Sequence, residues 1–166
     1  MTTLLGTSNV NSKLSSAIAN AKWHLGGASE SNNKTLTAEG IYTEERNTSA
    51  IYSGNPEYVF AQVGLMYPSD YGYATVGGTT TNRAGCRAKA IYDYDTADCK
   101  NNDWLFTSQN SFINNGEWFL SPYSSYSSDA ALLSSSGYVN LYTSVSYYQF
   151  AVRPAFYLDS SVLKIV

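Results

Sequence analysis

The single histidine, His24, limits the nucleophilic chemistry open to this chain. A Ser-His-Asp triad needs a histidine as its general base, so any triad would have to use His24. This residue stands beside Trp23 in a segment with helical spacing, and the sequence contains no Gly-x-Ser-x-Gly nucleophile elbow. The glycine-containing stretch VGGTTTN, residues 76–82, lacks the lysine of a phosphate-binding P-loop. These patterns predict a protein that is not an enzyme and that needs no cofactor.

The sequence contains few residues that could bind a metal ion through nitrogen or sulfur. One histidine and two cysteines do not complete a zinc site, which takes three or four ligands at fixed spacing. Asp93, Asp95 and Asp98 lie together in DYDTAD, but an EF-hand loop starting there would lack its fifth-position oxygen, its central glycine and its closing glutamate. A different oxygen cage that adds residues 101–103 stays open, against a solvated loop. We expect no metal.

Cys86 and Cys99 are the only cysteines, in a chain rich in Ser, Thr, Asn and Tyr and poor in charge. An even pair in such a composition predicts one disulfide and an exported protein. A loop of this length would contribute about 3 kcal/mol of stability in the chain-entropy description. The alternative is two unrelated buried thiols.

Residues 121–148 consist mainly of Ser and Tyr, and Asp129 is the only charged residue between Trp118 and Val152. Interleaved Tyr, Leu and Val argue against disorder. Tyrosine supplies contact area at low entropic cost and serine supplies adaptable hydrogen bonds, so the segment predicts a binding face. The alternative is an exposed serine-rich hairpin without a partner. The expected face comprises Tyr123, Ser125, Tyr126, Ser128, Tyr138, Asn140, Tyr142, Ser144, Ser146, Tyr147 and Tyr148. Strand alternation would turn some of these inward.

The whole composition suits a single domain over residues 1–166. Hydrophobic residues make up 43% of the chain, which is enough to form a core. The net charge is -3 and the basic residues are scattered, so we expect no nucleic-acid partner. No apolar run reaches the length of a membrane span, and residues 1–14 do not form a signal peptide. We expect no membrane contact by this domain.

The elements that must position the face begin with two predicted helices. Apolar residues recur at three- and four-residue steps through residues 8–25, which predicts a first helix ended by Gly26-Gly27. A second helix is expected around Ala38 to Arg46. A strand is expected at Val59 to Met66, followed by a turn at residues 67–70.

The second half reads as short strands. The apolar segments WLFTSQNSF and EWFLSP flank a turn at Asn114 to Gly116, and ALLSSSGYVNLYTSVS carries a second hairpin pattern. AVRPAFYL has the look of a buried closing strand. Helices followed by short antiparallel strands and long loops predict an α+β domain.

WHLGG, YSGNPEYVFAQVGLMYPSDYGYAT, CKNNDWL, WFLSP and SSSGYV followed by VRPAFYL occur in this order and cover most of the chain from Trp23 onward. In this the chain resembles the C-terminal globular domain of bacterial surface and pilin-like proteins, related to the variable proteins of diversity-generating retroelements. The resemblance implies a C-type-lectin-like fold of the subclass shared with formylglycine-generating enzyme. It implies a non-enzymatic ligand-binding or adhesion domain at the cell surface, on a pilus or on a virion tail. Residues 1–22 would be the remnant of an anchor or linker.

In the retroelement systems, adenine mutagenesis of Asn codons does not yield Lys, Glu, Gln, Met or Trp. Every residue from Phe119 to Tyr148 falls outside that excluded set. The resemblance therefore implies a diversified face that meets a protein or glycan on another cell or phage host, with Arg153 forming a structural ion pair or binding a carbonyl. The alternative is a structural pilin-like subunit that uses the same face for assembly. An oligomer could form through an N-terminal segment that precedes this chain.

Two motif groups of the wider fold class do not match. Cys86 and Cys99 lack the Arg-Gly-Gly context of formylglycine-generating enzymes, which argues against oxidase activity. Asn55-Pro56-Glu57 and Asn102-Asp103-Trp104 have the wrong order for the triplets of calcium-dependent lectins. Calcium-mediated sugar binding is therefore not expected.

Overall fold

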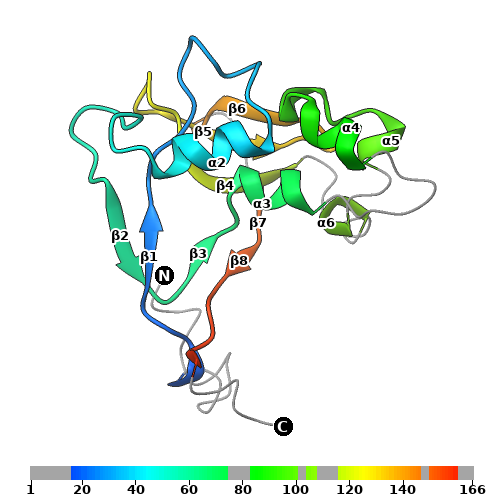
Figure 1. Cartoon of the computed structure of the whole chain (residues 1–166). Coiled ribbons are helices and arrows are strands. Elements are labelled where there is room, and N and C mark those ends of the chain that lie inside the picture. Colours follow the sequence, from blue (N-terminus) through cyan, green and yellow to red (C-terminus); the bar gives the residue numbers. More distant parts are fainter. Residues whose placement is uncertain (1–15, 75–82, 101–103, 108–115, 147–149, 161–166) are drawn as a thin grey trace, which may run out of the picture.

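The computed structural model describes residues 16–74, 83–100, 104–107, 116–146 and 150–160 of the chain. Short helices and short strands joined by long connections form a mixed α+β structure, as predicted (Figure 1). In chain order the elements are β1 (Ala21–His24), α2 (Ala38–Arg46), β2 (Tyr58–Ala61), β3 (Gly64–Leu65), α3 (Pro68–Tyr73), α4 (Arg83–Ala88), the 3-10 helix η1 (Ile91–Asp93), α5 (Ala97–Lys100), α6 (Trp104–Thr107), β4 (Glu117–Pro122), β5 (Asp129–Leu133), β6 (Val139–Ser144), β7 (Ala151–Val152) and β8 (Pro154–Ala155).

The last turns of the predicted first helix are strand β1, so that prediction is wrong there; residues 8–15 lie outside the described residues. β1 pairs antiparallel with β2, with Trp23 opposite Val59. Trp23 is buried, and its indole nitrogen donates a hydrogen bond of 2.8 Å to the carbonyl of Ala61. Pairing with a strand far along the chain outweighs the local helical spacing of the apolar residues.

Gly26 and Gly27 do not cap a helix; they mark a close approach of backbones. The amide of Gly26 donates to the carbonyl of Glu45, and the amide of Gly27 donates to that of Ala50. A Cβ atom on Gly27 would overlap the carbonyl oxygen of Pro122. The two glycines let the chain pass between the end of α2 and the end of β4.

Helix α2 has the predicted bounds. Its N-cap is Thr37, whose side-chain oxygen accepts a hydrogen bond of 3.1 Å from the amide of Gly40. Glu39 in the first turn and Arg46 in the last turn match the helix dipole. These local signals are sufficient to set the element.

The predicted strand over residues 59–66 divides into β2 and β3, which pair with different partners. The predicted turn at residues 67–70 is the start of helix α3. Pro68 occupies the first helical turn, and the carboxylate of Asp70 accepts a hydrogen bond of 2.9 Å from the amide of Tyr67. Proline has a preset φ for this position and lacks an N–H group that would be unpaired there.

The largest sheet has the strand order β6-β5-β4-β7. β4 matches EWFLSP, and β5 with β6 forms the predicted second hairpin. Residues 114 and 115 of the first predicted hairpin lie outside the described residues, and among those described β4 pairs with β5 and, in parallel, with β7. Residues 104–107, expected as part of an apolar hairpin segment, form helix α6.

Cys86 and Cys99 form the predicted disulfide, which joins α4 to α5. Both cysteines are buried, as are Ile91 and Tyr94 between them. The amide of Ile91 donates a hydrogen bond of 2.9 Å to the carbonyl of Leu36. The bridged segment is thus helical and anchored, and it is not a free loop.

AVRPAFYL is not a single buried strand. It supplies β7 and β8, and the side chains of Val152 and Phe156 are 59% and 44% exposed. The Nε atom of Arg153 lies 3.1 Å from a carboxylate oxygen of the fully buried Glu117. Arg153 therefore forms the expected ion pair.

The core contains tyrosines whose hydroxyls are hydrogen-bonded. Tyr71 donates to the carbonyl of Gly137 at 2.8 Å, and Tyr94 donates to that of Gly72 at 3.3 Å. A buried hydroxyl without a partner would be destabilising, so these bonds allow tyrosine to serve as a core residue. Tyr71 and Tyr94 are therefore structural residues.

Candidate functional site

Strand β6 sorts its side chains between the core and the surface. Val139, Leu141 and Thr143 are buried, whereas Asn140, Tyr142 and Ser144 remain partly exposed. Tyr138, just before the strand, is also partly exposed and has the same parity. Four of the predicted face residues, Tyr138, Asn140, Tyr142 and Ser144, therefore lie along one side of β6. We call these four side chains and Tyr126 the tyrosine face.

Tyr123 is not an exposed member of this face. Its side chain is 2% exposed, which corrects its expected placement on the surface. Its hydroxyl accepts a hydrogen bond of 2.8 Å from the amide nitrogen of Asn33. Its ring stacks on Tyr126, with centroids 5.8 Å apart, and lies 6.0 Å from the ring of Tyr142. Tyr123 thus supports two tyrosine-face residues from beneath and brings them together.

The four predicted serines form hydrogen bonds within the protein. The hydroxyl oxygen of Ser125 accepts a hydrogen bond of 2.9 Å from the amide of Glu30, which ties the loop after β4 to residues 29–33. Ser128 donates to Asp129, and the hydroxyls of Ser144 and Ser146 lie 2.9 Å apart. The structure therefore gives Ser125 and Ser128 a structural role. Tyr147 and Tyr148 lie outside the described residues.

Tyr92 extends the tyrosine face, although the sequence did not indicate it. Its ring centroid lies 5.4 Å from that of Tyr138, at an interplanar angle of 54°. The Nζ atom of Lys34 lies 5.5 Å from the Tyr92 centroid. Lys34, Tyr92 and Tyr138 are far apart in the sequence, so no local sequence pattern predicts that they lie together. The disulfide is the one sequence signal that could have indicated an ordered segment at Tyr92.

A cavity of about 230 Å³ opens beside these rings and is lined by Tyr92, Asp93, Asp95 and Tyr138. Two of the aspartates considered as calcium ligands therefore line the same cavity as Tyr138, which belongs to the tyrosine face. Among the described residues, no group of three or more His, Cys, Asp and Glu side chains could hold a metal ion.

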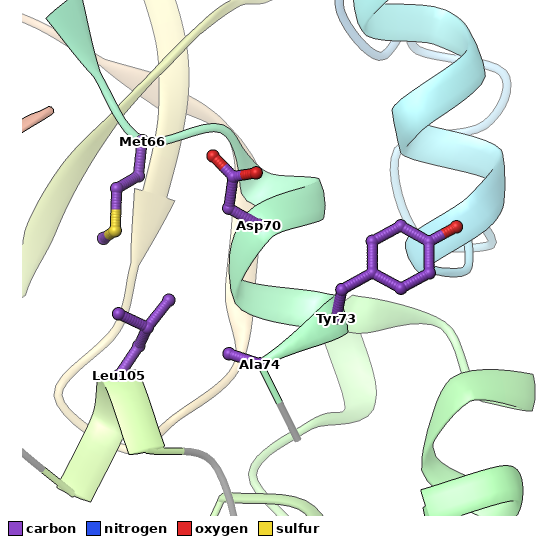
Figure 2. A pocket seen from close by; sticks show the side chains of 5 residues that line it. All are labelled: Met66, Asp70, Tyr73, Ala74 and Leu105. Atoms are coloured by element: carbon purple, nitrogen blue, oxygen red, sulfur yellow. The ribbon is translucent and has the colours of Figure 1, made fainter. Parts of the chain in front are cut away.

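A larger cavity of about 400 Å³ lies between α3 and α6 (Figure 2). Met66, Ala74 and Leu105 make it mainly apolar, and Asp70 contributes the carboxylate. Figure 2 shows the Tyr73 ring turned toward α2, where it meets Tyr42 edge-on with centroids 6.3 Å apart. The carboxylate of Asp70 accepts the hydrogen bond from the amide of Tyr67 at the start of α3, and it is the one charged group among the described residues that line this cavity.

Glu45 and His24 are two of the groups whose pKa values are shifted. Burial raises the pKa of Glu45 to about 7, although the hydrogen-bond donors of Ser69 and Arg46 act to lower it. The side chain of Glu45 has no exposed surface. Partial burial, then the positive charges of Lys22 and Arg46, lower the pKa of His24.

Comparisons with protein families, curated proteins and solved structures returned no match to this chain. Within the described residues, no helix combines the length and apolar character needed to cross a membrane.

Proposed function

We propose that this chain is a non-enzymatic binding domain with a C-type-lectin-like fold, which contacts a protein or glycan ligand through the tyrosine face. The observation that carries the proposal is the alternation of β6, which keeps Tyr138, Asn140, Tyr142 and Ser144 at the surface above a buried row. Short, mostly antiparallel strands joined by long connections agree with part of the layout that the resemblance implies, although β1 and not a helix is the first of the described elements.

The chemistry of the face supports ligand binding. Tyr126 is 52% exposed, and the buried Tyr123 holds its ring in a stacked position. Such a ring is presented with little remaining freedom, so a ligand that covers it would lose little conformational entropy. Hydroxyl and amide groups on Tyr142 and Asn140 add hydrogen-bonding capacity beside it.

An extracellular location belongs to the same proposal. The Cys86–Cys99 disulfide is of the kind that persists in oxidising environments, such as the outside of a cell. A low charge content and a tyrosine-rich surface are consistent with display on a cell surface, pilus or virion tail.

Diversification of the face can be tested without knowing the ligand. Codons 119–150 would be sequenced deeply in the natural population that carries this locus. We expect substitutions at adenines, concentrated at the codons of the exposed Tyr126 and the partly exposed Tyr138, Asn140 and Tyr142. The interleaved codons of Val139 and Leu141 serve as an internal control, because these side chains are buried. Equal constancy at both sets would contradict a diversified face.

The alternative, a pilin-like subunit, predicts that the tyrosine face binds another copy of the chain. Sedimentation of the purified chain with Tyr126→Ser and Tyr142→Ser variants separates the two functions. Self-association that both substitutions abolish would favour assembly. A monomeric wild type at high concentration favours binding of a different ligand.

A further inference from the structure

The cavity beside Tyr138 combines two aromatic rings with two carboxylates. It is lined by Tyr92, Asp93, Asp95 and Tyr138 and has a volume of about 230 Å³. We propose that this cavity binds the cationic head group of a lysine or arginine side chain presented by a polypeptide ligand. The inference rests on the proposed function, because Tyr138 belongs to both the cavity and the tyrosine face.

The rings provide the first attraction. The face of an aromatic ring carries negative potential and attracts a cation within about 6 Å of its centroid. The Tyr92 and Tyr138 rings are tilted by 54° with centroids 5.4 Å apart, so they form a corner and not a parallel stack. The chain itself places the ammonium group of Lys34 5.5 Å from the Tyr92 centroid. A cation is thus already accommodated at this ring, from outside the cavity.

The carboxylates provide the charge. Asp93 and Asp95 are both exposed, and within the described part of the chain neither side chain has a hydrogen-bond or ion-pair partner. Two unpaired carboxylates in one small cavity favour an incoming positive charge and disfavour an anion. They also match the donors of an ammonium or guanidinium group.

The lining is held in place before a ligand arrives. Ile91 and Tyr94 are fully buried on either side of Tyr92 and Asp93, and the Cys86–Cys99 disulfide encloses the segment. On the other side, the amide of Ser134 donates a hydrogen bond of 2.9 Å to the carbonyl of Tyr138. A prearranged cavity lowers the ordering cost of binding.

The size of the cavity argues for a single side chain. Its volume is below the roughly 300 Å³ at which pockets begin to hold drug-sized ligands. A neutral aliphatic head group of the same length would gain neither the ring nor the carboxylate interactions.

The test is an NMR titration of the isotopically labelled full chain with N-acetyl-lysine methylamide, N-acetyl-arginine methylamide and the neutral N-acetyl-norleucine methylamide. We expect the cationic probes to shift the amide signals of Tyr92 to Asp95 and of Tyr138, with affinity in the millimolar range typical of weak cation contacts. Norleucine should bind at least about tenfold more weakly. Equal shifts with norleucine, or no shifts at these amides, would overturn the proposal.

Charge-matched variants sharpen the result. The double variant Asp93→Asn with Asp95→Asn keeps the side-chain shape and removes both charges. It should lower the affinity for the lysine probe about tenfold or more. The control variant Glu39→Gln with Glu57→Gln removes two exposed charges elsewhere and should leave the affinity for the lysine probe unchanged. Equal weakening by both pairs would mean that net charge alone acts, which also overturns the proposal. Tetramethylammonium chloride distinguishes the source: tighter binding than lysine would point to a small free ammonium ligand instead.

Failure here is distinguishable from failure of the proposed function. Tyr126 and Tyr142 do not line the cavity, so Tyr126→Ala and Tyr142→Ala should leave the lysine titration unchanged. Diversified codons at these two positions without cation binding would overturn only the cavity proposal. Cation binding with invariant codons at the tyrosine face would retain the cavity and overturn a diversified face.

Discussion

Glu45 is a carboxylate inside the molecule. One of its oxygens accepts from the amide of Ser69 at 2.9 Å, and the other accepts from the Ser69 hydroxyl at 2.5 Å and from Arg46 at 3.0 Å. These donors favour the charged form, but removal from water outweighs them and raises the pKa to about 7. The side chain links α2 to the start of α3 and therefore makes the packing of these helices sensitive to pH.

We expect the free energy of unfolding to fall between about pH 4.5 and pH 7 because of Glu45. The folded state binds this proton more tightly than the unfolded chain, so the stabilisation is complete below the unfolded pKa and is lost as pH rises through the folded pKa. A shift of this size corresponds to about 3 kcal/mol. Urea unfolding of the wild type and of Glu45→Gln from pH 4 to 8 gives the free energy of unfolding at each pH. The contribution of Glu45 is the difference between the pH dependences of the two proteins.

The exposed Glu39→Gln on the same helix is the control for the Glu45 prediction. Its pH profile should follow that of the wild type. A wild-type profile parallel to that of Glu45→Gln would contradict the raised pKa. Asp70, whose pKa burial also raises, adds a change of the same sign to all three proteins and cancels in the comparison.

Gly27 is required for space and not for backbone freedom, because it is not among the positive-φ glycines of the described chain. We expect Gly27→Ala to destabilise the fold by several kcal/mol, since its Cβ would overlap backbone that cannot rotate away. Gly40→Ala on α2 is the matched change: its Cβ meets the side chains of Leu36 and Thr37 and no backbone outside its own helix, and alanine favours helix, so the effect should stay within about 1 kcal/mol. Thermal unfolding of both variants provides the comparison, and a Gly27→Ala protein as stable as Gly40→Ala would contradict it.

At the scale of elements, the disulfide holds α4 and α5 beside the tyrosine face. The cysteines are separated by 13 positions, and closing such a loop stabilises the native state by about 3 kcal/mol in the chain-entropy description. We expect Cys86→Ala with Cys99→Ala to lower the free energy of unfolding by about this amount. Denaturant unfolding measures it, and thiol counting without reductant on the wild type is the control. Two free thiols in the wild type would contradict the bond.

At the scale of the whole molecule, the two ends of the described chain lie together. Ile18 forms a β-bridge with Leu158, and the amide of Ala19 donates a hydrogen bond of 2.8 Å to the carbonyl of Tyr157 (Figure 1). The Arg153–Glu117 ion pair joins this C-terminal segment to the main sheet. The ion pair therefore connects the closing segment to the core.

Arg153→Met should destabilise the whole fold by about 2 kcal/mol or more, because the carboxyl group of Glu117, which has no exposed surface, loses the Arg153 guanidinium. Pairing it with Glu117→Gln removes the buried charge and should recover part of the loss. Urea unfolding of the two single variants and the double variant completes a double-mutant cycle. Simple additivity in that cycle would show that the pair does not contribute.

Local signals in the sequence determined several features correctly. The position of α2, the hairpin of β5 and β6, and the cysteine pair depend on short-range interactions or on a covalent bond, so their patterns can be recognised without the fold. The α+β class followed from them. The Ser/Tyr composition indicated the region of the candidate face.

Tertiary structure decided what each tyrosine does and where the cavity lies. Tyr123 is inside because Asn33 satisfies its hydroxyl, and Tyr92 faces Tyr138 because a disulfide-bridged segment packs beside β6. β1 is a strand because its partner β2 lies far along the chain. In each case the deciding contact joins residues distant in sequence, and the energy of such a contact does not appear in local spacing or composition.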